Sequence, residues 1–200
     1  MEKGILLVIS GPSGAGKGTI CRAVRQSDPS LRLSVSATTR SPRKGEVNGI
    51  DYFFLNEKEF REMIAGGQFL EWAEVYGNYY GTPVNYVRQE LERGRDVILE
   101  IDIQGALQVK KKFPEAVLVF IAPPSKTELI ARLSARGTDS AGEIAKRINC
   151  TAAELKLADR YDYIIVNDDL DRALNKVRAI ITAEKSRPRF FNTGYSRFEH

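Results

Sequence analysis

Four short runs of continuous apolar residues limit the folds that are open to this chain. The runs are ILLVIS (5–10), DVILEID (96–102), AVLVFIA (116–122) and YIIVN (163–167). Each has the length of one strand, and strands that are apolar on both faces are typical of parallel sheets covered by helices. Helical stretches lie between the runs. The sequence therefore predicts an α/β fold with a mainly parallel sheet flanked by helices.

Residues that begin and end helices mark the intervening segments. In three pairs an acid follows a cap residue by three positions, as in a capping box: Asn56 with Glu59, Ser125 with Glu128, and Ser140 with Glu143. Gly66–Gly67 and Gly94 are expected helix ends. The segment FLEWAEVYGNYYG (69–81) alternates around Gly77–Asn78 and predicts a β-hairpin.

The composition argues against several classes of protein. The 200 residues predict one domain, and no apolar run approaches the roughly 20 residues of a membrane span. The apolar start is too short for a signal peptide. A net charge of +4 is too small to indicate a nucleic-acid partner. Cys21 and Cys150 lack metal-ligand spacing, which is typical of a cytoplasmic protein. The single histidine is His200, so we expect no catalysis by a histidine.

A glycine-rich segment follows the first apolar run directly and precedes a helical stretch. Gly11, Gly16 and Lys17 match the GxxxxGK spacing of a phosphate-binding loop (P-loop). Glycines let backbone N–H groups surround phosphate oxygens, and the following helix N-terminus adds partial positive charge. A glycine-rich turn with a surface lysine is the alternative. The residues expected to bind nucleotide phosphates here are Gly11, Pro12, Ser13, Gly14, Ala15, Gly16, Lys17, Gly18 and Thr19.

One position departs from the P-loop pattern. Gly18 stands where the motif has the hydroxyl that binds magnesium, and Thr19 follows it. We therefore expect no direct protein ligand for Mg²⁺. The phosphates of ATP and water would hold the ion, with Thr19 and Asp102 as candidates to act through water.

The P-loop by itself leaves GTPase, ATPase and kinase open. DIQG (102–105) ends a strand and imitates the DxxG element of GTPases. A GTPase also needs an Asn-Lys-x-Asp sequence to read its base. The only Asn-Lys pair, Asn175–Lys176, is followed by Val and Arg, so the GTPase reading fails.

The polar segment TTRSPRKGEVNGIDYFF (38–54) predicts a second anion site. Arg40 and Arg43 are three residues apart, and Tyr52 follows them. A guanidinium group matches phosphate oxygens bidentately, so the pattern suits an anion with several oxygens. Two arginines that merely solvate a polar loop are the alternative.

These segments, with FLEWAEVYGNYYGTP, ILEIDIQG, FIAPPS, ARGT and IVNDDL, resemble the guanylate kinases from about residue 5 to residue 185. The resemblance implies a bacterial-type, single-domain nucleoside monophosphate kinase fold of the P-loop class. It implies a core (1–33, 84–124 and 151–186), a GMP-binding segment (34–83), a lid (125–150) and a C-terminal tail (187–200).

The resemblance also assigns the acceptor site. Arg40, Arg43, Tyr52 and Tyr80 would bind the phosphate of GMP. Glu71 would accept the N1–H and 2-amino hydrogens of guanine, a donor pair that adenine lacks. Ser36, Thr82 and Asp102 would lie near the base. From the residues alone, Glu71 is as well explained as a solvated acid of the hairpin.

The nucleophile implied by this assignment is a phosphate oxygen of GMP, which is already anionic near neutral pH and needs no histidine base. Catalysis then rests on positioning and on neutralising charge. The groups implied are Lys17, Mg²⁺ and the lid arginines Arg132, Arg136 and Arg147, with Asn167 on the adenine side. Arginines on a solvated helix face are the alternative. We expect mutual repulsion of Arg40, Arg43, Arg136 and Arg147 to open the empty cleft.

The function expected is transfer of the γ-phosphoryl group of ATP to GMP, and to dGMP. Another small-molecule phosphate kinase of this fold, or a non-catalytic binding module of guanylate-kinase-like fold, stays an alternative. A general ATPase has least support, because no residue is visibly placed to activate water. The expected partners are ATP and GMP, with no nucleic acid and no membrane. The sequence does not indicate an oligomeric state.

Overall fold

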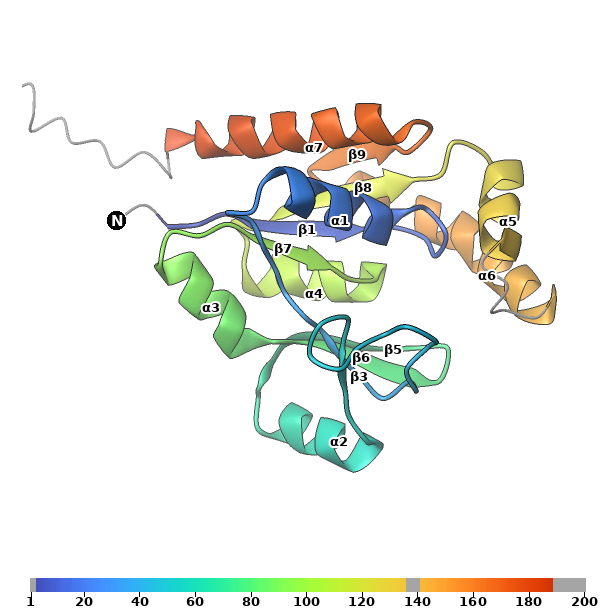
Figure 1. The fold of residues 1–200 in the computed structure, drawn as a ribbon, viewed down its shortest axis with the longest axis horizontal. Helices are drawn as coiled ribbons and strands as arrows, with labels where there is room; N and C mark the ends of the chain where they lie inside the picture. Colours follow the sequence, from blue (N-terminus) through green and yellow to red (C-terminus); the bar gives the residue numbers. More distant parts are fainter. Residues whose placement is uncertain (1–2, 136–140, 189–200) are drawn as a thin grey trace, which may run out of the picture.

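The computed structural model describes residues 3–135 and 141–188, and every structural statement below concerns these residues. A five-stranded parallel sheet forms the centre of the molecule (Figure 1). Its order is β2 (Arg32–Leu33), β7 (Val97–Glu100), β1 (Leu6–Ser10), β8 (Val117–Ala122) and β9 (Tyr163–Val166). All four apolar runs contain strands of this sheet, which confirms the predicted α/β fold.

Side chains alternate between the two faces of the sheet, and each face is covered by helices. Leu7 and Ile9 of β1 pack with α1 (Lys17–Ser27) and α7 (Leu170–Lys185). Leu6 and Val8 pack with α3 (Val84–Glu92) and α4 (Ile103–Lys112). Burial on both faces explains why the runs are apolar throughout, without the alternation of a half-exposed strand.

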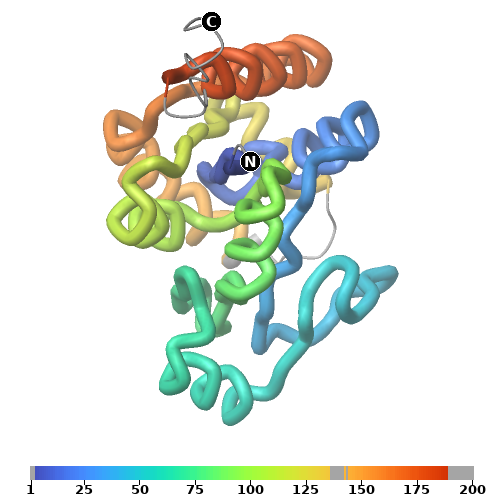
Figure 2. Tube along the Cα trace, turned by 90° about the vertical axis from the view of Figure 1, so that its left-hand side faces the viewer, coloured from blue at the N-terminus to red at the C-terminus, as the bar shows by residue number. Residues whose placement is uncertain are grey.

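A second, four-stranded sheet lies beside the first and was only partly expected. Its order is β4 (Phe53–Phe54), β3 (Ala37–Thr38), β6 (Asn78–Pro83) and β5 (Phe69–Val75). Helix α2 (Glu57–Ala65) covers it through Phe60, which stacks on Phe69. We call β3 to β6 with α2 the hairpin unit. Figure 2 shows it as the blue-green lower part, joined to the parallel sheet through the segment before β3 and through α3.

The predicted hairpin is confirmed, but its turn lies one residue earlier than expected. Val75 pairs with Asn78, which leaves Tyr76 and Gly77 as the two-residue loop. Both take left-handed backbone conformations, with φ of 52° and 78°. Two-residue hairpin loops of this kind match the twist of the strands, and they normally place Gly or Asn where Tyr76 stands.

The predicted helix starts and ends are confirmed where the structure describes them. Asn56 and Glu59 form a complete capping box at α2, and Gly66 ends that helix. At α5 (Lys126–Ala135), Ser125 Oγ accepts from the Glu128 amide at 3.1 Å. Ser140, the cap residue of the third pair, lies outside the described residues. Helix α6 (Ala141–Leu155) and a short 3₁₀ helix (Ala158–Arg160) precede β9.

No helix in the described ranges is both long and apolar enough to cross a membrane. Cys21 and Cys150 are free thiols, with Cys21 buried. Of the tail predicted from residue 187, the structure describes only residues 187 and 188.

Candidate active site

The glycine-rich segment forms a tight loop between β1 and α1. Gly11, Gly14 and Gly16 have φ of 139°, 88° and 96°, conformations that residues with a Cβ rarely adopt. A Cβ at Gly11 would also overlap the carbonyl oxygen of Ile121. Gly16 caps α1, so the predicted strand–loop–helix arrangement is present. Its backbone N–H groups and the helix N-terminus suit it to bind phosphate.

Lys17 folds back over this loop. Its ammonium group donates to the carbonyl oxygens of Gly11 at 2.7 Å and Pro12 at 3.0 Å. The charge therefore lies at the centre of the loop, where phosphate oxygens would collect. This is not the position of a solvated surface lysine.

Two residues from distant segments contact the loop at Ala15. Asn167 is buried, and its side-chain amide donates to the Ala15 carbonyl at 2.8 Å. Arg132 of α5 donates to the carbonyl oxygens of Asn167 at 3.0 Å and Ala15 at 3.5 Å, and pairs with Glu128 at 2.9 Å. The structure thus places Asn167, expected on the adenine side, in contact with the P-loop at Ala15.

The predicted lid contributes a further arginine to the loop. Arg147 of α6 donates from Nη1 to the hydroxyl of Ser13 at 2.7 Å. Figure 1 shows α5 and α6 at the end of the sheet where β1 and β8 terminate. Arg132 and Arg147 are therefore brought together at the P-loop, whereas Arg136 lies outside the described residues.

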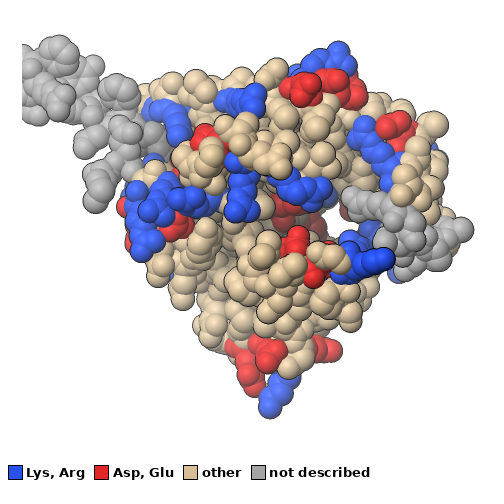
Figure 3. All heavy atoms as spheres, viewed as in Figure 1, with Lys and Arg blue, Asp and Glu red and all other residues tan. Residues whose placement is uncertain are grey.

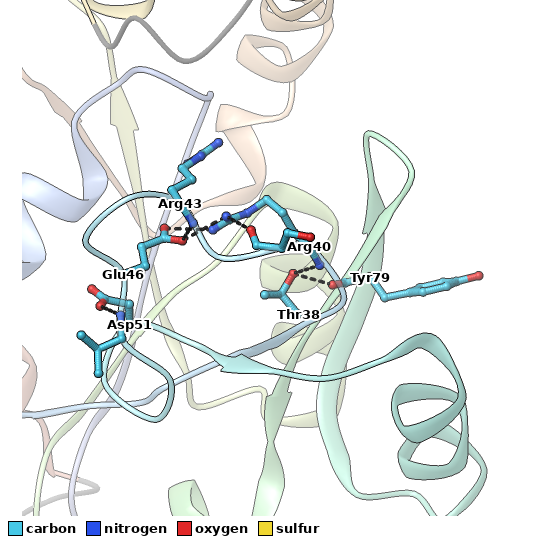
Figure 4. A network of polar contacts seen from close by, with 8 residues as sticks. Thr38, Arg40, Arg43, Glu46, Asp51 and Tyr79 are labelled. Atoms are coloured by element: carbon cyan, nitrogen blue, oxygen red, sulfur yellow. Dashed lines mark hydrogen bonds and ion pairs between the residues drawn. The ribbon is translucent and has the colours of Figure 1, made fainter.

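The predicted anion site contains an acid that the sequence reasoning left without a role. Glu46 accepts from both terminal nitrogens of Arg40, at 2.9 and 3.0 Å, and from the backbone amide of Arg43 at 2.7 Å (Figure 4). Burial works against the charge of Glu46, but the hydrogen bonds from Arg40 and Arg43 outweigh it and lower its pKa. The RxxRxxE spacing (40–46) is the signal that could have identified it.

For Arg40 this pair reduces the expected repulsion among the arginines, because Glu46 matches its charge. The guanidinium of Arg43 points away from Glu46, and the residue is exposed (Figure 4). Glu46 thus connects the side chain of Arg40 to the backbone of Arg43. It orders the segment around an anion site without neutralising Arg43.

Two tyrosines complete the anion site. The Arg40 guanidinium lies over the Tyr52 ring, 5.4 Å from its centroid, and the Tyr52 and Tyr80 rings meet edge to face at 6.1 Å. Burial, the nearby Glu100 carboxylate and Tyr80 raise the pKa of Tyr52 to about 12. Its hydroxyl is therefore protonated at neutral pH and able to donate to a phosphate oxygen.

The proposed base-reading acid is buried. Only 2% of Glu71 is exposed, and its Oε1 accepts from the Thr82 hydroxyl at 2.6 Å. Ser36 Oγ lies 3.5 Å from Thr82 Oγ1. Burial raises the pKa of Glu71 to about 7, with the Thr82 hydrogen bond opposing and Asp102 adding to the shift. The structure therefore rejects the alternative of a solvated hairpin acid and gathers the predicted base-site residues.

Helix α4 packs against the Glu71 carboxylate at Gly105. A Cβ at Gly105 would overlap Glu71 Oε2, so glycine at this position allows the helix to pass the carboxylate where it now lies. Asp102 caps α4 and accepts from the amides of Gln104 at 3.2 Å and Gly105 at 3.1 Å. Helix capping is a role that the sequence reasoning missed for Asp102, although an Asp that follows a strand and precedes a helix is a usual cap.

A second acid missed by the sequence reasoning, Glu100, lies beside Gly18. A Cβ there would lie 3.1 Å from Oε1 of Glu100, the last residue of β7. Glu100 also lines a small pocket with Ser34, Ser36 and Tyr52. The described residues contain no cluster of three His, Cys, Asp or Glu side chains that could hold a metal, and Thr19 is exposed. The Glu100 carboxylate, next to the first turn of α1, is placed to interact through water with a Mg²⁺ ion that nucleotide phosphates would hold.

The charged groups gather around one opening. Figure 3 shows Lys and Arg side chains around the space between the parallel sheet and the hairpin unit, with acidic side chains at its floor. Such an arrangement suits two anionic substrates that meet between the two parts.

Comparison with known proteins agrees with this geometry. The family model described as guanylate kinase matches residues 3–184. A guanylate kinase of Caldanaerobacter subterraneus subsp. tengcongensis is 58% identical over 93% of this chain and 90% of its own length. The guanylate kinase of Bacillus subtilis is 53% identical over 92% of this chain and 90% of its own.

A solved structure supports the same relationship. The crystal structure of guanylate kinase from Anaplasma phagocytophilum has a TM-score of 0.83 and 31% identity, covering 100% of this chain and 98% of that one. The chain therefore belongs to the guanylate kinase family and is an ATP:GMP phosphotransferase.

Proposed function

We propose that the chain transfers the γ-phosphoryl group of ATP in line to GMP or dGMP, with the two nucleotides entering from opposite sides of the opening. The observation that carries this is the buried Glu71–Thr82 pair, at 2.6 Å, on the hairpin unit, while the P-loop with Lys17 belongs to the parallel sheet. One substrate site is thus contributed by each part.

On the donor side, the P-loop amides and Lys17 bind the ATP phosphates. Arg132 and Arg147 contact the loop through Ala15 and Ser13, and this proximity to the phosphate loop supports a role for both cations in phosphoryl transfer. Charge on the oxygens of that group is stabilised by such cations, the main source of catalysis in phosphoryl transfer. Arg136 is proposed for the same role from its sequence position alone.

On the acceptor side, Arg40, Arg43, Tyr52 and Tyr80 bind the phosphate of GMP, and Glu71 reads the base. A buried carboxylate that meets adenine instead of guanine would lose its donor pair, so AMP should be a poor substrate. Ser36, Thr82 and Asp102 complete the base site. A buried carboxylate that reads guanine favours GMP as the acceptor, and so argues against the alternative of a kinase for another small-molecule phosphate.

We propose that Mg²⁺ accompanies ATP and lies beside Glu100, with Thr19 and Asp102 acting at most through water. When bound, the ion neutralises charge on the phosphates of ATP. We also propose a cytoplasmic place in purine nucleotide metabolism, in keeping with the two free cysteines.

Turnover with separate acceptors tests the proposal. Coupled measurement of ADP formation should show GMP and dGMP used well, and AMP at least about a hundredfold less efficiently in kcat/KM. Comparable values for AMP and GMP would refute the base site. ADP formation with ATP alone, at the rate seen with GMP, would instead indicate an ATPase.

A further inference from the structure

Tyr76 has a backbone conformation that its side chain does not favour. Among residues 3–135 and 141–188 it is the one non-glycine residue with positive φ, at 52°. A bulky aromatic residue is disfavoured there, whereas Asn and Gly are well tolerated. The residue lies at the tip of the β5–β6 hairpin and is 41% exposed, so the core of the hairpin unit does not explain the choice.

The ring of Tyr76 instead contacts the lid helix α6. The Arg147 guanidinium lies over it, 4.9 Å from the centroid, and the Lys146 ammonium lies at 5.9 Å. Burial raises the pKa of Tyr76, and Glu154 and Cys150 contribute to the same shift. These four residues recur along one helix at spacings that place most of them on one face. Figure 1 shows the hairpin extending to the side on which α5 and α6 lie.

Arg147 also contacts the phosphate loop. Arg147 Nη1 donates to Ser13 Oγ at 2.7 Å while the Tyr76 ring attracts the guanidinium. A π face attracts a guanidinium without accepting a strong N–H hydrogen bond, so the donors that phosphate oxygens require are not consumed. One side chain thus connects the hairpin unit, the lid and the P-loop.

We propose that Tyr76 is a positioning residue for phosphoryl transfer, whose ring holds Arg147 at the phosphate loop and so couples the hairpin unit to the lid. The proposal rests on the catalytic role proposed above for Arg147. Tyr76 itself touches neither substrate. The unfavourable backbone conformation is retained because the turn must present an aromatic ring to α6.

Substitutions at position 76 separate the ring from the backbone. Tyr76→Asn removes the ring but suits the left-handed conformation, so its melting temperature should equal or exceed that of the native protein. Its single-turnover rate with saturating ATP and GMP should nevertheless fall between about twofold and thirtyfold, the range of one cation–π contact. Tyr76→Phe retains the ring and should restore the native rate. Single turnovers are used because product release can hide the transfer step.

A neighbouring substitution and a double variant provide the controls. Asn78→Ala alters the same turn but keeps the ring, and should leave the rate unchanged. Combining Tyr76→Asn with Arg147→Met should slow transfer no further than Arg147→Met alone, because Tyr76 acts through that arginine.

The outcomes distinguish the two proposals. If Arg147→Met retains the native rate, the catalytic role of Arg147 is wrong and the proposal for Tyr76 falls with it. If Arg147→Met is slow but Tyr76→Asn is as fast as the native protein, only the positioning role is wrong. A Tyr76→Asn variant that loses rate and melting temperature together, or a Tyr76→Phe variant equally slow, would also overturn it in favour of a merely structural role.

Discussion

Glu46 holds Arg40 by both of its terminal nitrogens, at 2.9 and 3.0 Å, in the segment proposed to grip the phosphate of GMP. The Arg40 side chain is only 14% exposed, so the pair is better shielded than a surface salt bridge. Its second contact, from the Arg43 amide, fixes the loop between the two arginines. Glu46 therefore orders the anion site, although its charge has the same sign as that of the phosphate that the site is proposed to bind.

Replacing Glu46 should weaken the acceptor site. Glu46→Ala frees the Arg40 side chain, and we expect KM for GMP to rise by about tenfold, within the effect of one charge-assisted contact, while KM for ATP stays constant. Glu57→Ala, which removes the exposed pair with Arg61 in the same unit, is the matched control and should change neither constant. A lower KM for GMP in Glu46→Ala would show that Glu46 competes with phosphate.

Arg43 should act on GMP alone. Its guanidinium is not engaged by Glu46, and the anion site belongs to the hairpin unit, whereas the P-loop belongs to the parallel sheet. Arg43→Ala should raise KM for GMP by about tenfold or more, as expected for a lost charge-assisted hydrogen bond, with ATP affinity nearly intact. Equal losses for both nucleotides, measured by steady-state kinetics and ATP binding, would move the arginine to the donor side.

The burial of Glu71 should cost stability that a neutral substitute recovers. Its pKa of about 7 exceeds the ordinary 4.5, so the folded state binds the proton more tightly than the unfolded chain. The stabilisation that comes from tighter proton binding by Glu71 in the folded state is fully present below pH 4.5 and is lost as pH rises through 7. Glu71→Gln should therefore raise the free energy of unfolding at pH 8 by up to about 3 kcal/mol, with no gain at pH 4, in denaturant titrations. Equal gains at both pH values would contradict the shift.

The same pKa predicts how GMP use depends on pH. The ionised carboxylate accepts both guanine donors, and the protonated form does not, so KM for GMP should rise about tenfold for each pH unit below 7. The phosphate of GMP titrates near 6 and adds its own effect. Glu71→Gln, although weak in GMP binding, isolates that effect because it lacks the titrating carboxyl. An identical pH profile for the variant would exclude Glu71 as the group responsible.

A side chain at Gly105 should displace the carboxylate of Glu71. Alanine favours helix by roughly 1 kcal/mol over glycine, yet its Cβ would overlap Glu71 Oε2. Gly105→Ala should raise KM for GMP by about tenfold or more without changing that for ATP, because Glu71 must move. Gly142→Ala in α6 gains the same propensity with no atom within 4 Å of the new Cβ, and serves as the control. A native KM for GMP in Gly105→Ala would show that Glu71 does not read the base from its present position.

Local patterns in the sequence determined the parallel sheet, the phosphate loop and the capping of α2 and α5. Each depends on residues a few positions apart, such as Gly11 and Gly16 around a loop or Asn56 and Glu59 at a helix start. The hairpin was also predicted, although its turn was misplaced by one residue because Tyr76 adopts a conformation usual for Gly or Asn. Resemblance to a family, and not periodicity, supplied the lid arginines and the base-reading role of Glu71, whereas the spacing of Arg40 and Arg43 by itself indicated an anion site.

Tertiary structure decided which of these groups meet. Glu71 resembles a solvated acid in its own segment, but it is buried between Thr82 of the neighbouring strand and α4, which passes it at Gly105. Glu100 lies beside Gly18 because β7 and β1 are adjacent in the sheet, and Arg147 lies between Tyr76 and Ser13 because α6 packs at the end of that sheet. Contacts between residues so far apart in sequence depend on packing of whole elements, which leaves no local periodicity from which they could be predicted.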